Sequence, residues 1–126
     1  MEIIFICKDG DYGSLLSHFV DAVTAKKAGK DAGLIVAEEA LRAIATGDFT
    51  PRPALDDHIN WGVIRGAGFP TDCNGLLTLA KEAGVPIIAC GGWTAILGLQ
   101  GKLPEGVIVG EIGPILLEAE KIVGGF

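Results

Sequence analysis

The stretch Val85-Pro-Ile-Ile-Ala-Cys-Gly-Gly-Trp-Thr94 places a cysteine where an apolar strand ends and a short helix is expected to begin. The apolar run lies between glycines, which is typical of a buried strand in a parallel sheet. Cys90 falls at the carboxyl end of this strand, the edge where open α/β sheets bind their ligands. If residues 94–99 are helical, the amino end of that helix faces the sulfur and favours the thiolate. The alternative is that Cys90 is a small, buried and inert hydrophobic residue.

Strands and helices are expected to alternate along the rest of the chain. The other strands are predicted at residues 2–7, 32–37, 107–110 and 121–125. Helices are predicted at residues 14–28, 38–46, 73–83, 93–99 and 113–120, with Ser14 and Asp72 as N-caps of the first and third. This alternation, without a hairpin signal, predicts an α/β fold of three layers (α/β/α) with a roughly five-stranded parallel sheet. We expect residues 1–126 to form a single domain, and the order of the strands stays open.

Residues 48–72 are the least regular part of the sequence. Pro51, Pro53 and Pro70 interrupt this segment, and a short helix within residues 54–64 is one interpretation. The segment is long for a simple connection, and such segments tend to be functional covers, mobile loops or interface elements. The sequence does not distinguish a lid from an interface.

Composition and charge exclude several classes of protein. The net charge of the 126-residue chain is −6, which argues against a nucleic-acid partner because no basic patch could match the phosphates. No apolar run approaches the roughly 18–20 residues that a membrane span requires, so no membrane association is expected. The apolar residues 1–6 lack a basic lead-in and run into a charged loop, which indicates a first strand and not a signal peptide. A cytoplasmic protein is therefore expected.

The three cysteines and two histidines narrow the possible chemistry. The cysteines are widely separated without a C-x-x-C spacing, which predicts reduced thiols and no zinc site. Cys7 is expected to pack as core, and Asp72 opposes activation of Cys73 at the start of its helix. His18 is expected to be a surface or partly packed helix residue, and His58 beside two aspartates is a weak metal candidate. No nucleotide-binding motif is present, and we expect neither a metal nor a cofactor.

Other candidate site residues come from the loops that should share the carboxyl edge with Cys90. If all strands are parallel, residues 8–13 and the start of the helix at Glu38 lie at this edge. Tyr12 is then expected near Cys90, where its hydroxyl can hydrogen-bond a thiolate or a substrate. The alternative is that Tyr12 is a loop residue packed on the domain.

The order of these features resembles the DsrE/DsrF-like family of small sulfur-relay proteins over nearly the whole chain. Asp9-Gly-Asp-Tyr-Gly13 resembles the opening loop of that family, and Glu82-Ala-Gly-Val-Pro-Ile-Ile-Ala-Cys-Gly91 resembles the segment that holds its active cysteine. Gly106-Val-Ile-Val-Gly110 and Glu118-Ala-Glu-Lys-Ile-Val123 are similar to its closing strand, helix and strand.

The resemblance implies that Cys90 carries sulfur as a persulfide, exchanged with sulfur-donor and sulfur-acceptor proteins, in homotrimers, hexamers or mixed hexamers. Gly91 and Gly92 would leave room for an extra sulfur atom and for a partner's cysteine. Trp93 is expected either to cover the site or to pack in a subunit interface. The chain departs from the family at Leu97, where a basic residue often precedes the glycine, and at Trp93, where some members have a second cysteine.

Two other functions stay open. One is a non-catalytic oligomeric module of the same fold that binds a small ligand near Tyr12 and Cys90. The other is a thiol redox sensor, which would form a sulfenic acid or a disulfide under mild oxidation. Both use the same fold and differ from a sulfur carrier only in the chemistry at this edge of the sheet.

Overall fold

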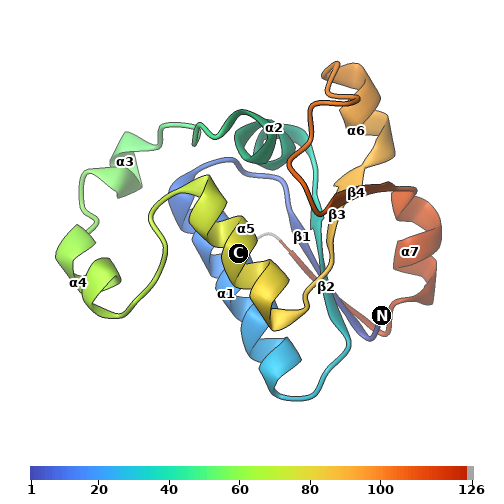
Figure 1. The fold of residues 1–126 in the computed structure, drawn as a ribbon, viewed down its shortest axis with the longest axis horizontal. Coiled ribbons are helices and arrows are strands. Elements are labelled where there is room, and N and C mark those ends of the chain that lie inside the picture. The colour runs from blue at the N-terminus through green and yellow to red at the C-terminus, as the bar shows by residue number, and fades with distance from the viewer. Residues whose placement is uncertain (125–126) are drawn as a thin grey trace.

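A computed structural model describes residues 1–124 as a five-stranded parallel sheet flanked by helices (Figure 1). The strands are β1 (Ile3–Cys7), β2 (Ala32–Val36), β3 (Ile87–Cys90), β4 (Val107–Gly110) and β5 (Lys121–Gly124). The predicted fold class is therefore confirmed, and the strand order that the sequence left open is β4-β3-β2-β1-β5. Gly125, the last residue of the predicted fifth strand, lies outside the described residues.

The helices follow the predicted order but differ from the prediction at several ends. They are α1 (Tyr12–Lys27), α2 (Glu38–Thr46), α3 (Pro53–Asp56), α4 (Trp61–Gly66), α5 (Cys73–Ala83), α6 (Gly91–Ile96) and α7 (Ile112–Glu118). The bounds of α2 and α5 agree with the prediction. Both end at glycines with left-handed backbone, Gly47 at φ 79° and Gly84 at φ 78°, which few other residues adopt without strain. Residues 48–72 contain two short helices, α3 and α4, where the sequence suggested one short helix within residues 54–64.

The predicted N-cap of the first helix, Ser14, is wrong. Asp11 is the N-cap, and its Oδ2 accepts a hydrogen bond of 3.1 Å from the Ser14 N–H. Asp11 is only 3% exposed, and Arg52 lies 3.5 Å from its other carboxylate oxygen. The paired carboxylate is a stronger acceptor than a serine hydroxyl, so the helix begins earlier and includes Tyr12 in its first turn.

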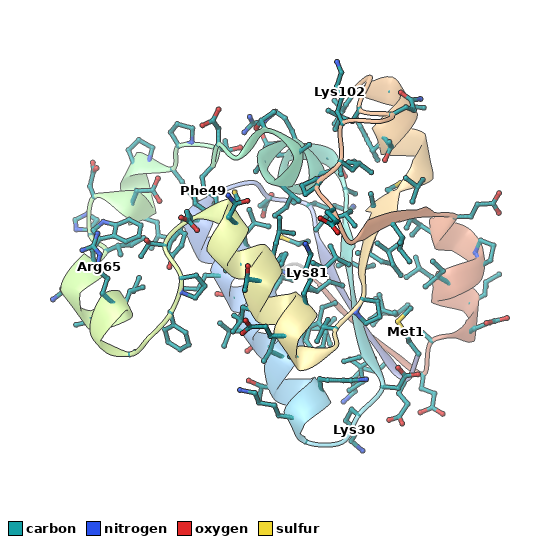
Figure 2. All side chains as sticks on the ribbon, viewed as in Figure 1. Met1, Lys30, Phe49, Arg65, Lys81 and Lys102 are labelled. Atoms are coloured by element: carbon teal, nitrogen blue, oxygen red, sulfur yellow. The ribbon has the colours of Figure 1, made fainter. Side chains whose placement is uncertain are left out.

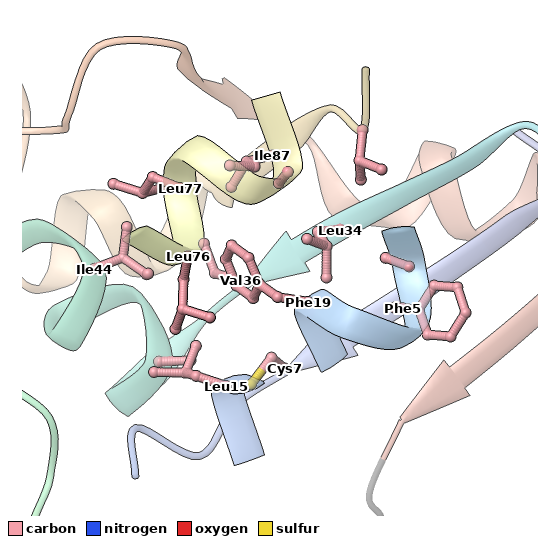
Figure 3. Close-up of a cluster of buried hydrophobic side chains, with 14 of the residues drawn as sticks. Phe5, Cys7, Leu15, Phe19, Leu34, Val36, Ile44, Leu76, Leu77 and Ile87 are labelled. Carbon is pink, nitrogen blue, oxygen red and sulfur yellow. The ribbon is translucent and has the colours of Figure 1, made fainter. Parts of the chain in front are cut away.

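The two faces of the sheet have separate apolar cores. On one face, strand residues such as Phe5, Leu34 and Ile87 pack with helices α1, α2 and α5, as Figure 3 shows. On the other face, Ile4, Ile35 and Ile88 are buried under α7. Ile112, Ile115 and Leu116 of α7 pack there, together with Ala119 just after the helix. Alternate residues of each strand therefore face the two helical layers, as expected for a parallel sheet covered on both sides.

Candidate functional site

Cys90 is the last residue of β3, and α6 begins at the next residue. Its sheet partner is Gly110, the last residue of β4. The Thr94 hydroxyl donates a hydrogen bond of 2.8 Å to the Cys90 carbonyl, and Thr94 is only 2% exposed. This bond ties the end of the strand to the first turn of α6, so the position of the Cys90 backbone is fixed. Sequence reasoning missed this role of Thr94, although a threonine four residues after a helix N-cap is a recognisable signal for such a bond.

The two glycines after Cys90 have different surroundings. A Cβ at position 91 would lie 3.3 Å from the carbonyl oxygen of Gly110, so a side chain there would press on the neighbouring strand. A Cβ at position 92 would meet no atom within 4 Å. Trp93 is partly buried and packs against the main core, which anchors α6. The space around Gly92, two residues after Cys90, is therefore open.

Cys90 is the accessible thiol among the described cysteines. Cys7 is 0% exposed and Cys73 is 3% exposed, whereas Cys90 is partly exposed, and none of the three is in a disulfide. Burial raises the pKa of Cys7 to about 12, and the carboxylates of Asp9 and Asp11 add to this effect. Burial also raises the pKa of Cys73 to about 11, with the carboxylates of Asp72 and Asp48 as further causes. Both buried thiols are therefore protonated and unreactive at neutral pH.

We expect Cys7 to make the protein less stable in alkaline solution. Its pKa rises from 9.0 in the unfolded chain to about 12 in the fold, so above pH 9 the unfolded chain loses a proton that the folded chain keeps. The contribution to stability is complete below pH 9 and falls by about 1.4 kcal/mol per pH unit as the pH rises toward 12. Urea unfolding between pH 8 and pH 11 should show a steeper loss for the native chain than for Cys7→Ala. Equal slopes would contradict the prediction.

Tyr12 does not join Cys90 in the structure. Its ring packs against Phe49 and Trp61, with ring centroids 5.2 Å and 4.9 Å away, and its hydroxyl donates to the Pro70 carbonyl at 2.5 Å. Burial raises the pKa of the Tyr12 hydroxyl, and the side chain is 2% exposed. Tyr12 follows β1, and β2 lies between β1 and the Cys90 strand. Tyr12 therefore anchors residues 48–72 to the body of the protein. This position is closer to the alternative, in which Tyr12 is packed on the domain, than to a place beside Cys90.

The surface or partly packed position expected for His18 is wrong, because His18 is only 3% exposed. Its Nδ1 lies 2.7 Å from the Ser14 carbonyl oxygen, which can only accept, so Nδ1 carries the proton of this hydrogen bond. The side chain lines a cavity of about 310 Å³ beside Ile6, Lys8 and Gly124. Helix α1 therefore buries more of its circumference than its sequence pattern indicated.

An ion pair joins the two loops that were expected to share this edge of the sheet, although the residue pattern did not indicate that their side chains pair. The Lys8 ammonium lies 3.7 Å from the Glu38 carboxylate; Lys8 follows the end of β1, and Glu38 is the first residue of α2, just after β2. Glu38 has φ 54°, a left-handed conformation that is strained for a residue with a side chain. Such strain is invisible in a residue pattern because it arises from the packing of the turn.

Within residues 1–124, no group of three or more His, Cys, Asp or Glu side chains could hold a metal ion. His58 is exposed at the end of α3 beside Asp57. No helix in the described part of the chain is long and apolar enough to cross a membrane.

The fold is similar to two solved structures of bacterial proteins. The ychN protein from E. coli superimposes with a TM-score of 0.68 at 19% sequence identity, covering 99% of this chain and 99% of that chain. BT1422, a conserved protein of unknown function from Bacteroides thetaiotaomicron, has a TM-score of 0.64 at 15% identity, covering 98% of this chain and 94% of that chain. At these identities the similarity shows the fold alone. No protein-family model matches the sequence, and no curated protein matches it.

Proposed function

We propose that the protein carries sulfur as a persulfide on Cys90 and passes it to a partner protein. The observation that carries this proposal is the partly exposed Cys90 at the carboxyl end of β3, with open space beside Gly92. A carrier of this kind needs one accessible nucleophilic thiol and no general-base triad. The space beside Gly92 suits an added sulfur atom and the approach of a partner's thiol.

The chemistry of such a carrier balances without an added oxidant. The Cys90 thiolate attacks the outer sulfur of a donor persulfide, a new S–S bond forms on Cys90, and the donor leaves as a thiolate. In the second step the thiolate of the acceptor attacks the outer sulfur held on Cys90. The acceptor then carries the persulfide, and Cys90 is released as a thiolate.

The fold supports the resemblance to the sulfur-relay family, though not the chemistry of Cys90 itself. The five-stranded parallel sheet flanked by helices is the architecture expected from the family that the sequence resembles, and the ychN protein from E. coli has the same fold. The same proposal includes sulfur-donor and sulfur-acceptor proteins as partners, a homo-oligomer of three or six copies, and a cytoplasmic location.

The site gives less support to the two alternative functions, a small-ligand-binding module and a thiol redox sensor. A ligand held between Tyr12 and Cys90 would need the two side chains to face one cavity, whereas Tyr12 packs against Trp61 and Phe49. A sensor that forms a disulfide within one chain would need a second accessible thiol. Cys7 and Cys73 are both buried, with raised pKa values.

Transfer of sulfur from the loaded protein tests the proposal. The protein is incubated with inorganic polysulfide, desalted and treated with cyanide, which removes the outer sulfur of a persulfide as thiocyanate. We expect about one thiocyanate per chain, and none above background from Cys90→Ser, because only Cys90 is an accessible thiol. Cys73→Ser is the matched control and should release as much thiocyanate as the native chain. Equal release from all three proteins would contradict the proposal.

A further inference from the structure

Lys8 lies in the same row of the sheet as Cys90, two strands away. The preceding residues of β1, β2 and β3 are paired in register: Cys7 with Val36, and Val36 with Ala89. Lys8, Ala37 and Cys90 therefore form the next row, and the Ala37 N–H continues the ladder with a hydrogen bond of 3.1 Å to a β1 carbonyl. Neighbouring strands lie about 4.8 Å apart, so roughly 10 Å separates the backbones of Lys8 and Cys90.

The side chains of this row belong to the face of the sheet that α7 covers. The residues two positions earlier on the same strands all pack in the core under α7: Ile6, Ile35 and Ile88. Ala37 at φ −143° and ψ 165° and Cys90 at φ −60° and ψ 119° keep an extended backbone, so the alternation of side chains continues into the row. The residue between Lys8 and Cys90 in this row carries only a methyl group, and no large side chain of the row separates them.

Sulfur transfer to Cys90 brings two anions together. The Cys90 thiolate attacks the outer sulfur of a polysulfide or persulfide that is itself negatively charged, Cys90–S–S⁻ forms, and the donor leaves as a thiolate. Repulsion between like charges slows this approach, and the exposed carboxylates of Asp9, Glu39 and Glu111 at the same edge add to it. Among the described residues that directly follow β1, β2, β3 and β4, Lys8 alone is positively charged.

Lys8 is accessible to such an anion, although it is paired in the structure with Glu38. The Lys8 side chain is 66% exposed, and its ammonium lies 3.7 Å from the Glu38 carboxylate. An exposed ion pair contributes little to stability, so an incoming anion can replace Glu38 beside the ammonium. Glu38 has φ 54°, where glycine would be unstrained, so the chain keeps a carboxylate at a strained position. Strained residues of this kind are concentrated at functional sites.

We infer that Lys8 is a substrate-binding residue of the Cys90 site. Its ammonium draws the anionic end of the sulfur donor to the face of the sheet that holds Cys90, and Glu38 competes with the donor for this charge. Lys8 thereby supplies from β1 the positive charge that is missing at Leu97 after Cys90. The assignment rests on the proposed sulfur transfer, whereas the effect of Lys8 on the approach of anions to Cys90 is measurable without it.

Two alkylating reagents of similar size measure this effect. Iodoacetate is an anion and iodoacetamide is neutral, and both react with the thiolate, so the ratio of their rates does not depend on the fraction of Cys90 that is ionised. We expect Lys8→Gln to lower the ratio of the iodoacetate rate to the iodoacetamide rate about threefold at low ionic strength, and Glu38→Gln to raise it by a similar factor. Lys8→Arg keeps the charge and should keep the native ratio. Added salt at about 0.5 M should shrink both differences, because it screens charges at this separation.

Opposite changes from two paired residues distinguish a charge effect from damage to the fold. Lys30→Gln is the matched control and should keep the native ratio, because Lys30 lies in the turn before β2, at the amino end of the strands (Figure 2). Glu38→Gly removes the carboxylate and the strain together, so it should raise the ratio and unfold at a temperature no lower than that of the native chain. An unchanged ratio in Lys8→Gln, or changes of the same sign in Lys8→Gln and Glu38→Gln, would overturn the inference.

The rate of sulfur loading connects Lys8 to the proposed function. Lys8→Gln should slow the loading of Cys90 by inorganic polysulfide about threefold, and Lys8→Arg should restore the rate. A loading rate that stays native while the iodoacetate ratio falls would overturn the role of Lys8 in sulfur transfer. Failure of the native chain and every variant to load would overturn the proposed function, and the alkylation rates would still show whether Lys8 attracts anions to Cys90.

Discussion

Replacing Phe19 by alanine is expected to lower the free energy of unfolding by about 3–5 kcal/mol. The Phe19 side chain is 0% exposed and lies in the core between α1 and the sheet, among Leu34, Val36 and Leu76 (Figure 3). Its removal loses buried apolar surface and leaves a cavity, because the surrounding strands and helices can collapse only in part.

Urea unfolding followed by circular dichroism measures this loss. Leu117→Ala in α7 is the control, because Leu117 is 89% exposed and its truncation should change the free energy of unfolding by no more than about 0.5 kcal/mol. A loss of less than about 1 kcal/mol in the free energy of unfolding of Phe19→Ala would show that Phe19 is not packed in the core as described.

The fold was predictable because its signals are local. Apolar runs such as residues 85–89 mark buried strands, and caps such as Asp72 and Gly84 mark the ends of a helix through bonds within a few residues. The Asp72 carboxylate accepts a hydrogen bond of 2.7 Å from the N–H of Gly75, as such a cap should. The order of the strands depends on which strands pair across long loops, and no local pattern records that.

The candidate site was predictable only in part, for the same reason. The end of β3 follows from sequence, so the place of Cys90 at the carboxyl edge could be predicted. The partners of Tyr12 could not, because Trp61 and Pro70 lie far along the chain in a segment without periodicity. The burial of His18 likewise depends on which strands flank α1, which the helical pattern alone does not reveal.

The second large effect expected is selectivity among the three thiols. Cys7 and Cys73 are buried with pKa values raised to about 12 and about 11, so at pH 8 a very small fraction of either is thiolate. Cys90 is partly exposed, and the space around Gly92, two residues further along the chain, is open. In the folded protein, polysulfide should therefore modify Cys90 alone, and the buried thiols should react only after unfolding.

The most direct measurement of this account is the intact mass of the folded chain after incubation with polysulfide at pH 8. We expect one adduct of about 32 Da, the mass of one sulfur atom, located by peptide mapping on Cys90 and removed by dithiothreitol. Cys90→Ser should give the unmodified mass under the same conditions. An unmodified native chain, or an adduct that persists in Cys90→Ser, would contradict the claim that Cys90 carries sulfur.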